Sequence, residues 1–272
     1  MKDQLTITLI QTQLFWEDKQ ANLEMLQQKI ESISEKTEII VLPEMFSTGF
    51  SMNAEALAET MDGPTVEWMK QVASAKRVAL TGSLIIKDTD ADGNNTYYNR
   101  LIWMLPNGQY GVYNKRHLFT LAGENEPYTA GEKRLIASVN DWKINLQICY
   151  DLRFPVWARQ VPQVPGENWR GLYDVLVYVA NWPEKRSNAW KTLLQARAIE
   201  NQCYVIGVNR VGNDGNNIPH TGDSMVIDPL GEVLYHKKAE EDIFTICLNK
   251  EHLNTIREKL PFWEDADAFK IF

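Results

Sequence analysis

The stretch LQICYD (residues 146–151) joins an apolar run to a cysteine and an acid. Leu146 and Ile148 alternate as in a buried β-strand. Cys149 stands where that apolar pattern ends, and Asp151 follows two residues later. A cysteine at such a position is either a small hydrophobic residue of the core or a nucleophile held at the end of a strand.

Runs like this one, rich in β-branched residues, recur along the chain, and helical patterns lie between several of them. The interior runs are apolar on both faces, so we expect strands that are covered on both sides. The expected helices cover residues 21–33, 66–72 and 187–201. The expected strands cover residues 5–12, 38–44, 78–86, 96–105, 144–151, 174–182, 203–212, 224–229 and 243–248.

Two stretches connect strand to strand without a helix between them. The pattern over residues 78–113 predicts an antiparallel meander, with DG and NG dipeptides as turn signals. The pattern over residues 224–237 predicts a hairpin with its turn at PLG. Such antiparallel connections argue against a single parallel sheet. We therefore expect an α/β fold in which two mixed β-sheets pack face to face and helices cover the outside.

The composition is that of a globular protein with a large core, because 44% of the 272 residues are hydrophobic and 24% are charged. The sequence contains no linker-like segment, so we expect a single domain over residues 1–272. Its C-terminal tail (about 250–272) would pack on the core or on a dimer interface. A net charge of −8 argues against nucleic acid and against an anionic membrane as partners.

The N-terminus lacks a signal-peptide pattern, and no apolar run approaches the roughly 18 residues of a membrane span, so we expect a cytoplasmic protein. The three cysteines and four histidines are dispersed without zinc-like spacing, which predicts free thiols and no metal. Cys203 and Cys247 lie inside apolar runs and are expected to be core cysteines.

Four polar side chains stand at or just after the ends of apolar runs, and in α/β proteins reactive groups gather beyond the carboxyl ends of strands. A free thiol, with a pKa of about 8.5, needs a base or a nearby cation to react at neutral pH. Glu44 is a candidate base, and Lys115 is a candidate fixed cation that would favour thiolate and stabilise an oxyanion. A thiol, a base and a cation together suffice for acyl transfer without histidine or metal. The four residues are Glu44, Lys115, Cys149 and Asn181.

The chain resembles the nitrilase superfamily of carbon–nitrogen hydrolases in three motifs that occur in the expected order. VLPEMFSTGF contains Glu44, YNKRHLF contains Lys115, and LQICYDLRFP contains Cys149. The resemblance continues through VYVANWP, LLQARAIENQCYVIGVNRVG and GDSMVIDPLGEV, so it covers nearly the whole chain. It implies an αββα sandwich, a Glu-Lys-Cys catalytic set and, because relatives are commonly dimers, a homodimer.

The resemblance also implies a second glutamate on the loop after the lysine motif. The loop LAGENEPYTAG (residues 121–131) offers Glu124 and Glu126. Glu126 lies five residues before Gly131, which is the better match to the family pattern. We therefore expect Glu126 to be catalytic and Glu124 to be a solvated loop residue.

Within the superfamily, HLFTLAGENEPYTAG, CYDLRFP, YVANWP and LPFWEDADAF are most similar to the ω-amidase branch. That branch removes ammonia from the terminal amide of 2-oxoglutaramate or 2-oxosuccinamate. The resemblance implies hydrolysis of a small amide through a thioester on Cys149, with no cofactor. Two alternatives within the superfamily are an N-carbamoyl amine hydrolase and a nitrilase. A more distant one is a non-enzymatic thiol sensor or binding protein.

Several polar residues near the nucleophile have expected roles in binding or packing. Arg153 would bind a substrate carboxylate through two parallel hydrogen bonds, or would be a structural partner of Asp151. Asp151 is expected to accept hydrogen bonds from the backbone rather than to act as a second base. Arg197 and Glu200, three residues apart, predict a structural ion pair. The substrate-binding residues are expected to be Tyr150, through its backbone N–H, Arg153, Asn181 and Trp182, as an apolar wall.

Overall fold

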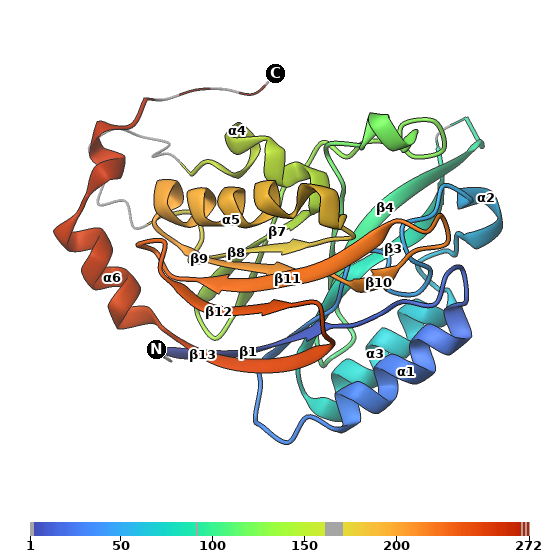
Figure 1. Ribbon diagram of the computed structural model, residues 1–272, viewed down its shortest axis with the longest axis horizontal. Coiled ribbons are helices and arrows are strands. Elements are labelled where there is room, and N and C mark those ends of the chain that lie inside the picture. Colours follow the sequence, from blue (N-terminus) through green and yellow to red (C-terminus); the bar gives the residue numbers. More distant parts are fainter. Residues whose placement is uncertain (1–2, 91, 161–170, 268, 270, 272) are drawn as a thin grey trace.

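A computed structural model describes residues 3–90, 92–160, 171–267, 269 and 271. They form two mixed β-sheets packed face to face, with helices on the two outer faces (Figure 1). The first sheet has the strand order β13-β1-β2-β3-β4-β5, and the second has the order β10-β11-β9-β8-β7-β6, with β12 paired to β11. This αββα sandwich confirms the expected fold class.

In the first sheet, β1, β2 and β3 are parallel, whereas β3, β4 and β5 form the expected antiparallel meander. β13 adds an antiparallel strand beside β1, so segments from the two ends of the chain lie side by side. The bounds are β1 (Gln4–Gln11), β2 (Ile39–Val41), β3 (Ala79–Thr89), β4 (Asn95–Met104), β5 (Tyr110–Asn114) and β13 (Asp242–Asn249).

In the second sheet, β7, β8 and β9 are parallel, and β6, β10, β11 and β12 add antiparallel pairs at its two sides. The hairpin expected over residues 224–237 is the β11–β12 pair. The bounds are β6 (Leu135–Val139), β7 (Trp142–Ile148), β8 (Val175–Val179), β9 (Tyr204–Val208), β10 (Val211–Asn213), β11 (Pro219–Ile227) and β12 (Val233–Lys238).

Two long helices cover the outer face of the first sheet, and one covers that of the second. α1 (Lys19–Glu31) and α3 (Pro64–Lys76) bury Leu26 and Met69 in a cluster with β1 to β4. α5 (Ser187–Asn201) buries Trp190 and Leu194 against β8, β9 and β11. The shorter elements are α2 (Ala54–Leu57), α4 (Pro155–Ala158), α6 (Lys250–Lys259), η1 (Thr120–Ala122), η2 (Cys149–Arg153), η3 (Glu184–Arg186) and η4 (Phe262–Asp265).

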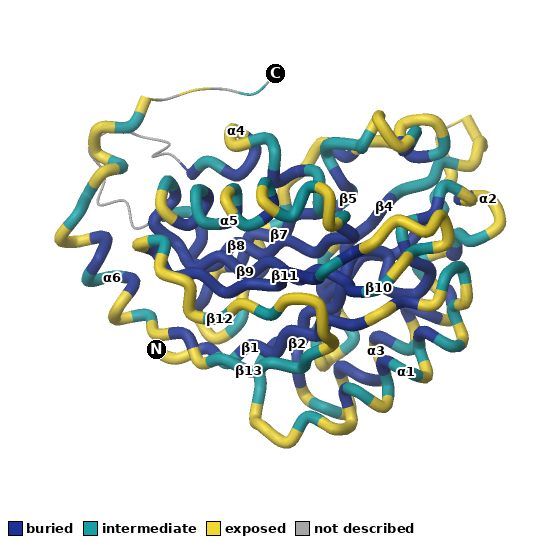
Figure 2. Tube along the Cα trace, in the orientation of Figure 1, coloured by how far each residue is buried: buried dark blue, intermediate teal, exposed yellow. Residues whose placement is uncertain are grey.

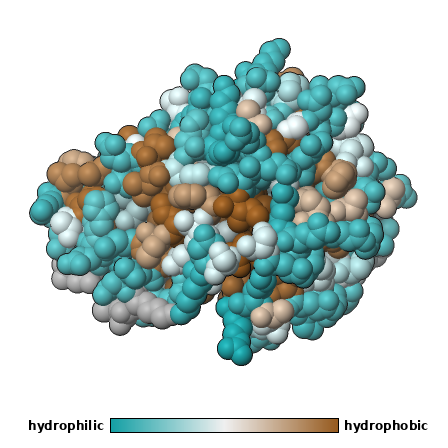
Figure 3. Space-filling model, turned by 60° about the horizontal axis from the view of Figure 1, so that its bottom comes forward, coloured by the Kyte–Doolittle hydropathy of each residue, from teal (hydrophilic) through white to brown (hydrophobic). Residues whose placement is uncertain are grey.

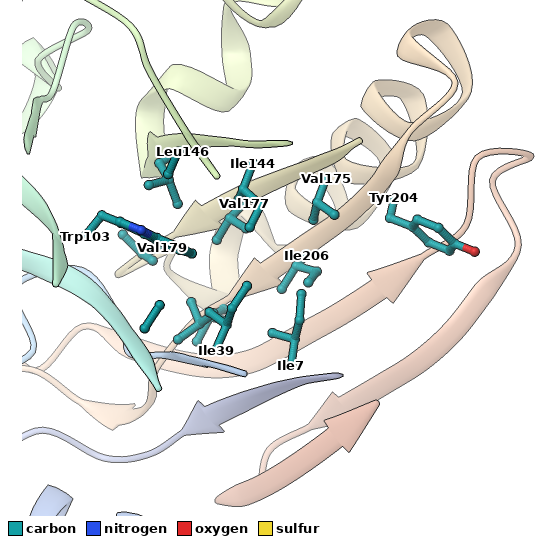
Figure 4. Close-up of a cluster of buried hydrophobic side chains, with 14 of the residues drawn as sticks. Ile7, Ile39, Trp103, Ile144, Leu146, Val175, Val177, Val179, Tyr204 and Ile206 are labelled. Carbon is teal, nitrogen blue, oxygen red and sulfur yellow. The ribbon is translucent and has the colours of Figure 1, made fainter. Parts of the chain in front are cut away.

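The interior between the sheets is apolar. Ile7 and Ile39 of the first sheet face Ile144, Val177 and Ile206 of the second (Figure 4). Along these strands the chain is buried, while the outward-facing sides of the helices are exposed (Figure 2). Side chains of both faces are therefore covered, as the continuous apolar runs of β8 and β9 predict. Among the described helices, none is long and apolar enough to cross a bilayer.

Candidate active site

The predicted reactive residues meet at one end of the sandwich, where strands of both sheets finish. Glu44 follows β2 and Lys115 follows β5, both in the first sheet. Cys149 follows β7 and Asn181 follows β8, both in the second. Because β2 and the β7–β8 pair present their carboxyl ends at this edge, the loops after them converge on one place.

The Lys115 ammonium lies between two carboxylates in the interior. Its Nζ is 2.9 Å from Glu44 Oε1 and 2.8 Å from Glu124 Oε2, and all three side chains are fully buried. Burial alone disfavours the ammonium, but the charges of Glu124 and Glu44 outweigh that effect and raise the pKa of Lys115 above its ordinary value. Lys115 is therefore a fixed cation at every physiological pH.

The position of Glu44 is set by neighbours on both sheets. Its Oε1 also accepts from Asn99 Nδ2 at 2.8 Å, and its Oε2 accepts from the backbone N–H of Asn181 at 2.8 Å. The Asn181 side chain donates to the backbone carbonyl of Glu44 at 2.5 Å. Glu44 is thus held from two directions, and its carboxylate has no freedom to turn away from the site.

The structure corrects the sequence-based choice between the two loop glutamates. Glu124 is the residue that contacts Lys115, and Glu126 is exposed. The reason is a tight turn at Gly123, where φ is +73° and a residue with a Cβ would be strained. The turn folds the chain back, so that the Glu124 carboxylate accepts from the backbone N–H of Phe119 at 2.6 Å and points inward. Glu126, two residues later, lines a separate polar groove.

Asn99 is a member of the site that the sequence analysis missed. Its Nδ2 lies 2.8 Å from Glu44 Oε1 and 3.2 Å from Glu124 Oε1, so it bridges the two carboxylates. Its backbone carbonyl also accepts from the N–H of Lys115 at 2.9 Å. The available signal was the polar pair of residues 99 and 100 in the middle of β4, directly before the apolar residues 101–104. We call Glu44, Asn99, Lys115, Glu124 and Cys149 the buried cluster.

Cys149 begins a short 3₁₀ turn with a backbone φ of +43°, a region that non-glycine residues rarely adopt. Asp151 holds this turn. Its Oδ2 accepts from the N–H of Ile148 at 3.0 Å and from the Tyr113 hydroxyl at 2.6 Å, and its Oδ1 accepts from the N–H of His117 at 3.0 Å. The expected structural role of Asp151 is confirmed, and the strained turn places Cys149, which is half-buried, beyond the end of β7.

The electrostatic setting of the thiol differs from the expectation. Burial raises the pKa of Cys149, the negative charge of Glu44 raises it further, and Lys115 only partly offsets these effects. The pKa of the thiol lies well above its ordinary value. Lys115 by itself would favour thiolate, but the two glutamates beside it outweigh its charge. The resting cysteine is therefore a protonated thiol close to the Glu44 carboxylate.

A cavity of about 380 Å³ opens onto Cys149 and Lys115. The four expected substrate-binding residues all line it: Tyr150, Arg153, Asn181 and Trp182. The Arg153 guanidinium lies 5.0 Å from the centre of the Trp182 ring. Within the described part of the chain it makes no ion pair with Asp151, whose oxygens are taken by other donors, so that alternative for Arg153 is wrong.

The sequence matches the carbon–nitrogen hydrolase family model over residues 6–258. This chain belongs to the carbon–nitrogen hydrolase family. It is 41% identical to the Escherichia coli protein named omega-amidase YafV, over 98% of this chain and 99% of that protein. It is 32% identical to the 2-oxoglutaramate amidase of Bacillus subtilis, over 96% of each chain.

Solved structures agree with this assignment. A superfamily protein from Xanthomonas campestris, whose crystal structure carries an arsenic adduct in its active site, is 40% identical over 99% of both chains, with a TM-score of 0.93. Nit3 of Saccharomyces cerevisiae, a member of the nitrilase superfamily, shares the fold with a TM-score of 0.80 at 24% identity, over 95% of both chains. The family and fold expected from the three motifs are confirmed.

Two further expectations concern the parts of this carbon–nitrogen hydrolase that surround the site. Arg197 pairs with Glu200 at 3.0 Å, as predicted, and also donates to the backbone carbonyl of Leu152. Cys203 is buried, but Cys247 is exposed, so the core assignment of Cys247 is wrong. Side chains alternate along β13, and Leu248 faces the core, which turns its neighbour Cys247 to the outer side of the sheet.

Proposed function

We propose that this protein is an ω-amidase that hydrolyses the terminal amide of a short, carboxylate-bearing substrate such as 2-oxoglutaramate or 2-oxosuccinamate. The observation that carries the proposal is a thiol beside a fixed ammonium and a held carboxylate, in a cavity that also contains an arginine without a carboxylate partner among the described residues. The relatives named for ω-amidase and 2-oxoglutaramate amidase activity support it, over nearly the full chain.

Acylation begins with the proton of the Cys149 thiol, for which the Glu44 carboxylate is the nearby base. As the sulfur attacks the amide carbon, Glu44 accepts the thiol proton, so negative charge moves from the carboxylate to the substrate oxygen. When the C–N bond breaks, the protonated Glu44 returns that proton to the departing nitrogen. Ammonia leaves, and a thioester remains on Cys149.

The oxyanion of the tetrahedral intermediate needs donors that are already in place. Lys115 Nζ is one, because the buried cluster fixes it beside the thiol. The backbone N–H of Tyr150 is the other, since N–H groups in the first turn of a helix have no partner within it. Removing one such donor in other acyl-transfer enzymes costs about 3–4 kcal/mol.

Deacylation uses the same residues in reverse. Water takes the place of ammonia, Glu44 accepts a proton from it, and the resulting hydroxide attacks the thioester carbon. The C–S bond breaks, the carboxylic acid product leaves, and the thiol of Cys149 recovers the proton from Glu44. Both half-reactions therefore need a single base and no cofactor.

Glu124 and Asn181 position the reacting groups. Glu124 holds Lys115 at 2.8 Å, and the pKa of Glu124 is itself raised, chiefly by burial. Asn181 lines the cavity, and its Oδ1 is buried with no hydrogen-bond partner among the described residues. We propose that this oxygen accepts from the N–H₂ of the substrate amide, which would turn the leaving nitrogen toward Glu44.

At the far end of the substrate, Arg153 would bind the carboxylate and Trp182 would limit the chain length. The test compares 2-oxoglutaramate with a neutral amide of equal length, in wild type and in Arg153→Gln, by ammonia release. We expect wild type to favour 2-oxoglutaramate, and Arg153→Gln to lose about 10- to 100-fold of that preference, because a hydrogen bond to a charged group contributes about 1.5–3 kcal/mol. Equal efficiency on both amides in wild type would refute the anionic substrate.

Product analysis distinguishes this activity from the neighbouring ones. An ω-amidase releases ammonia and a dicarboxylate, whereas an N-carbamoyl amine hydrolase releases carbon dioxide as well. A nitrilase would consume the matching nitrile. Mass spectrometry of the protein after mixing with the amide should show a thioester adduct, and its absence together with absent ammonia release would leave a thiol-binding protein as the better explanation.

We also propose a cytoplasmic homodimer in which residues 1–272 act as one domain. Support comes from exposed apolar side chains, which gather in places on an otherwise hydrophilic surface (Figure 3). In the tail, α6 buries Leu253 in the core, whereas Phe262 and Phe269 are exposed; Phe272, at the end of the tail, lies outside the described residues. Sedimentation analysis that gives a mass of 31.3 kDa, the monomer value, would refute the dimer.

A further inference from the structure

A second arginine, Arg186, lines the cavity and has no role in the mechanism above. It ends η3, which precedes α5, and its guanidinium lies 5.0 Å from the centre of the Phe119 ring. Its backbone carbonyl accepts from Trp182 Nε1 at 2.8 Å. Trp182 is the ring over which Arg153 lies. The two arginines are therefore tied to one another through Trp182.

Neither guanidinium is neutralised within the described part of the chain. Arg153 and Arg186 are half-buried, contact aromatic rings and form no ion pair there. Two acids also line the cavity, and one carboxylate oxygen of each accepts hydrogen bonds from neighbouring groups. Glu17 accepts from the Ser51 hydroxyl at 2.5 Å, and Asp214 accepts from the backbone N–H groups of residues 216 and 218.

A third cation lies behind the wall of the cavity. The Arg210 guanidinium is fully buried and donates only to backbone carbonyls, while its Nη1 has no partner among the described residues. Burial, followed by the charge of Arg210, lowers the pKa of His220, which lines the cavity, to about 4. His220 is therefore neutral at pH 7 and adds no charge to the cavity.

We propose that Arg186 is a specificity-determining residue that, together with Arg153, binds the far end of the substrate and selects oxo acids and plain carboxylates over α-amino acids. The inference rests on the proposed ω-amidase activity and names the residues that choose among its substrates. We call Phe119, Arg153, Trp182 and Arg186 the arginine wall.

The chemistry of the two far ends explains the selection. A 2-oxo carboxylate offers only acceptor oxygens, and two guanidinium groups supply only donors. One arginine can take the carboxylate in a bidentate pair while the other bridges to the 2-oxo oxygen. Glutamine has the same chain length but carries an ammonium beside its carboxylate, which adds a cation and three donors next to two guanidinium groups. Like charges at short range disfavour that complex.

The arginine wall is also connected to the catalytic residues. Phe119, under Arg186, donates its backbone N–H to Glu124, which holds Lys115. The two ends of a short substrate can thus be bound by groups that the loop of residues 119–124 connects. A substrate whose far end displaces Arg186 would move Phe119 and, through Phe119, the buried cluster. Substrates that fit the arginine wall poorly should therefore show a lower kcat as well as weaker binding.

The experiment measures kcat/KM for 2-oxoglutaramate, glutaramate and glutamine in wild type, Arg186→Gln, Arg186→Lys and Arg134→Gln. Arg134 is the matched control, since it also lies over an aromatic ring, 5.2 Å from the centre of Trp157, but outside the cavity. We expect wild type to prefer 2-oxoglutaramate over glutamine by at least about 100-fold, and Arg186→Gln to shrink that ratio by about tenfold. Arg186→Lys should keep the discrimination against glutamine, with a raised KM, because it retains the charge without the planar fork.

The outcomes separate the two proposals. Wild type that releases no ammonia from 2-oxoglutaramate or glutaramate overturns the proposed function. Active wild type whose oxo-to-amino ratio is the same in Arg186→Gln overturns the role of Arg186 alone. Should Arg186→Gln not fold, a KM for 2-oxoglutaramate that is unchanged in Arg186→Lys overturns that role instead. A similar loss of the ratio in Arg134→Gln would also overturn it, because the effect would then not depend on the cavity.

Discussion

The buried cluster and the arginine wall lie in the same cavity but are built in different ways. The cluster places an ammonium between two carboxylates, with all three side chains removed from solvent and each hydrogen-bonded to neighbouring residues. The wall consists of guanidinium groups over aromatic rings, on turns and loops, half-exposed to solvent. Apart from Glu124, which the turn at Gly123 brings in, the buried cluster is set by the sheet topology, and the arginine wall is set by local turns.

This difference indicates how the two regions respond to change. A buried charge that loses its partner costs about 3–5 kcal/mol, whereas an exposed charge contributes about 0–1 kcal/mol to stability. Substitutions at the charged residues of the buried cluster should therefore affect turnover and folding together. Substitutions in the arginine wall should change substrate choice while the fold stays intact. Four predictions test this division, in order of decreasing effect.

The largest effect is expected for Cys149→Ala, because no thioester can form without the sulfur. Turnover should fall by about 10⁴-fold or more, while the melting temperature stays near that of wild type. Ammonia release and circular dichroism on the same sample check both parts. Retained amidase activity in the folded variant would remove Cys149 from the mechanism.

Glu44→Gln and Lys115→Met should each lower turnover by about 100-fold or more, because one removes the base and the other an oxyanion donor. Lys115→Met should also destabilise the fold by about 3–5 kcal/mol, since it leaves two buried carboxylates without a cation. The double variant should lose less than the product of the single losses, because the residues act as a unit. A double variant whose loss of turnover equals the product of the two single losses would show that Glu44 and Lys115 act independently.

The two loop glutamates form a matched pair for testing the corrected assignment. Glu124→Gln should lower turnover by about 100-fold, because Lys115 loses one of its two charged partners. Glu126→Gln, two residues away on the surface, should stay within about twofold of wild type. Initial rates of ammonia release from one substrate check both variants. The reverse pattern would return the catalytic role to Glu126.

The smallest effect concerns His220 and appears only in acid. Its folded-state pKa of about 4 lies below the ordinary 6.5, so the unfolded chain binds more protons between these values. Stability should therefore fall as the pH drops from about 6.5 toward 4, by about 2 kcal/mol at pH 5 from this group. His220→Asn should flatten this part of a urea-denaturation series measured from pH 7 to pH 4.5. An unchanged slope in that variant would assign the acid sensitivity to other groups.

The fold and the position of Cys149 beyond the end of a strand could be predicted from the sequence, because apolar runs and turn dipeptides are local signals. Cys149 and Glu44 stand directly beyond such runs. The choice between Glu124 and Glu126 was not accessible, because it depends on a left-handed turn at Gly123 that reverses the chain within two residues.

Other features depend on contacts between distant segments. Asn99 belongs to the site only because β4 lies beside the loop that follows β5, and one polar residue within a strand does not predict that neighbour. Cys247 looked like a core residue because its strand is apolar, but β13 forms the outermost strand of its sheet and only one of its faces meets the interior. Arg186 carries no motif, and its place in the cavity follows from a 3₁₀ turn.

The protonated state of Cys149 has a consequence for the chemical durability of the protein. Peroxides and alkylating reagents attack thiolates, and a thiol whose pKa is raised by burial and by a neighbouring carboxylate offers few of them. The nucleophile thus becomes reactive mainly when an electrophilic carbon is present to receive the charge. Cys247 is exposed on the surface, far from the catalytic chemistry, and general thiol reagents should reach it first. Under mild oxidation the chain should accumulate surface damage before it loses its activity.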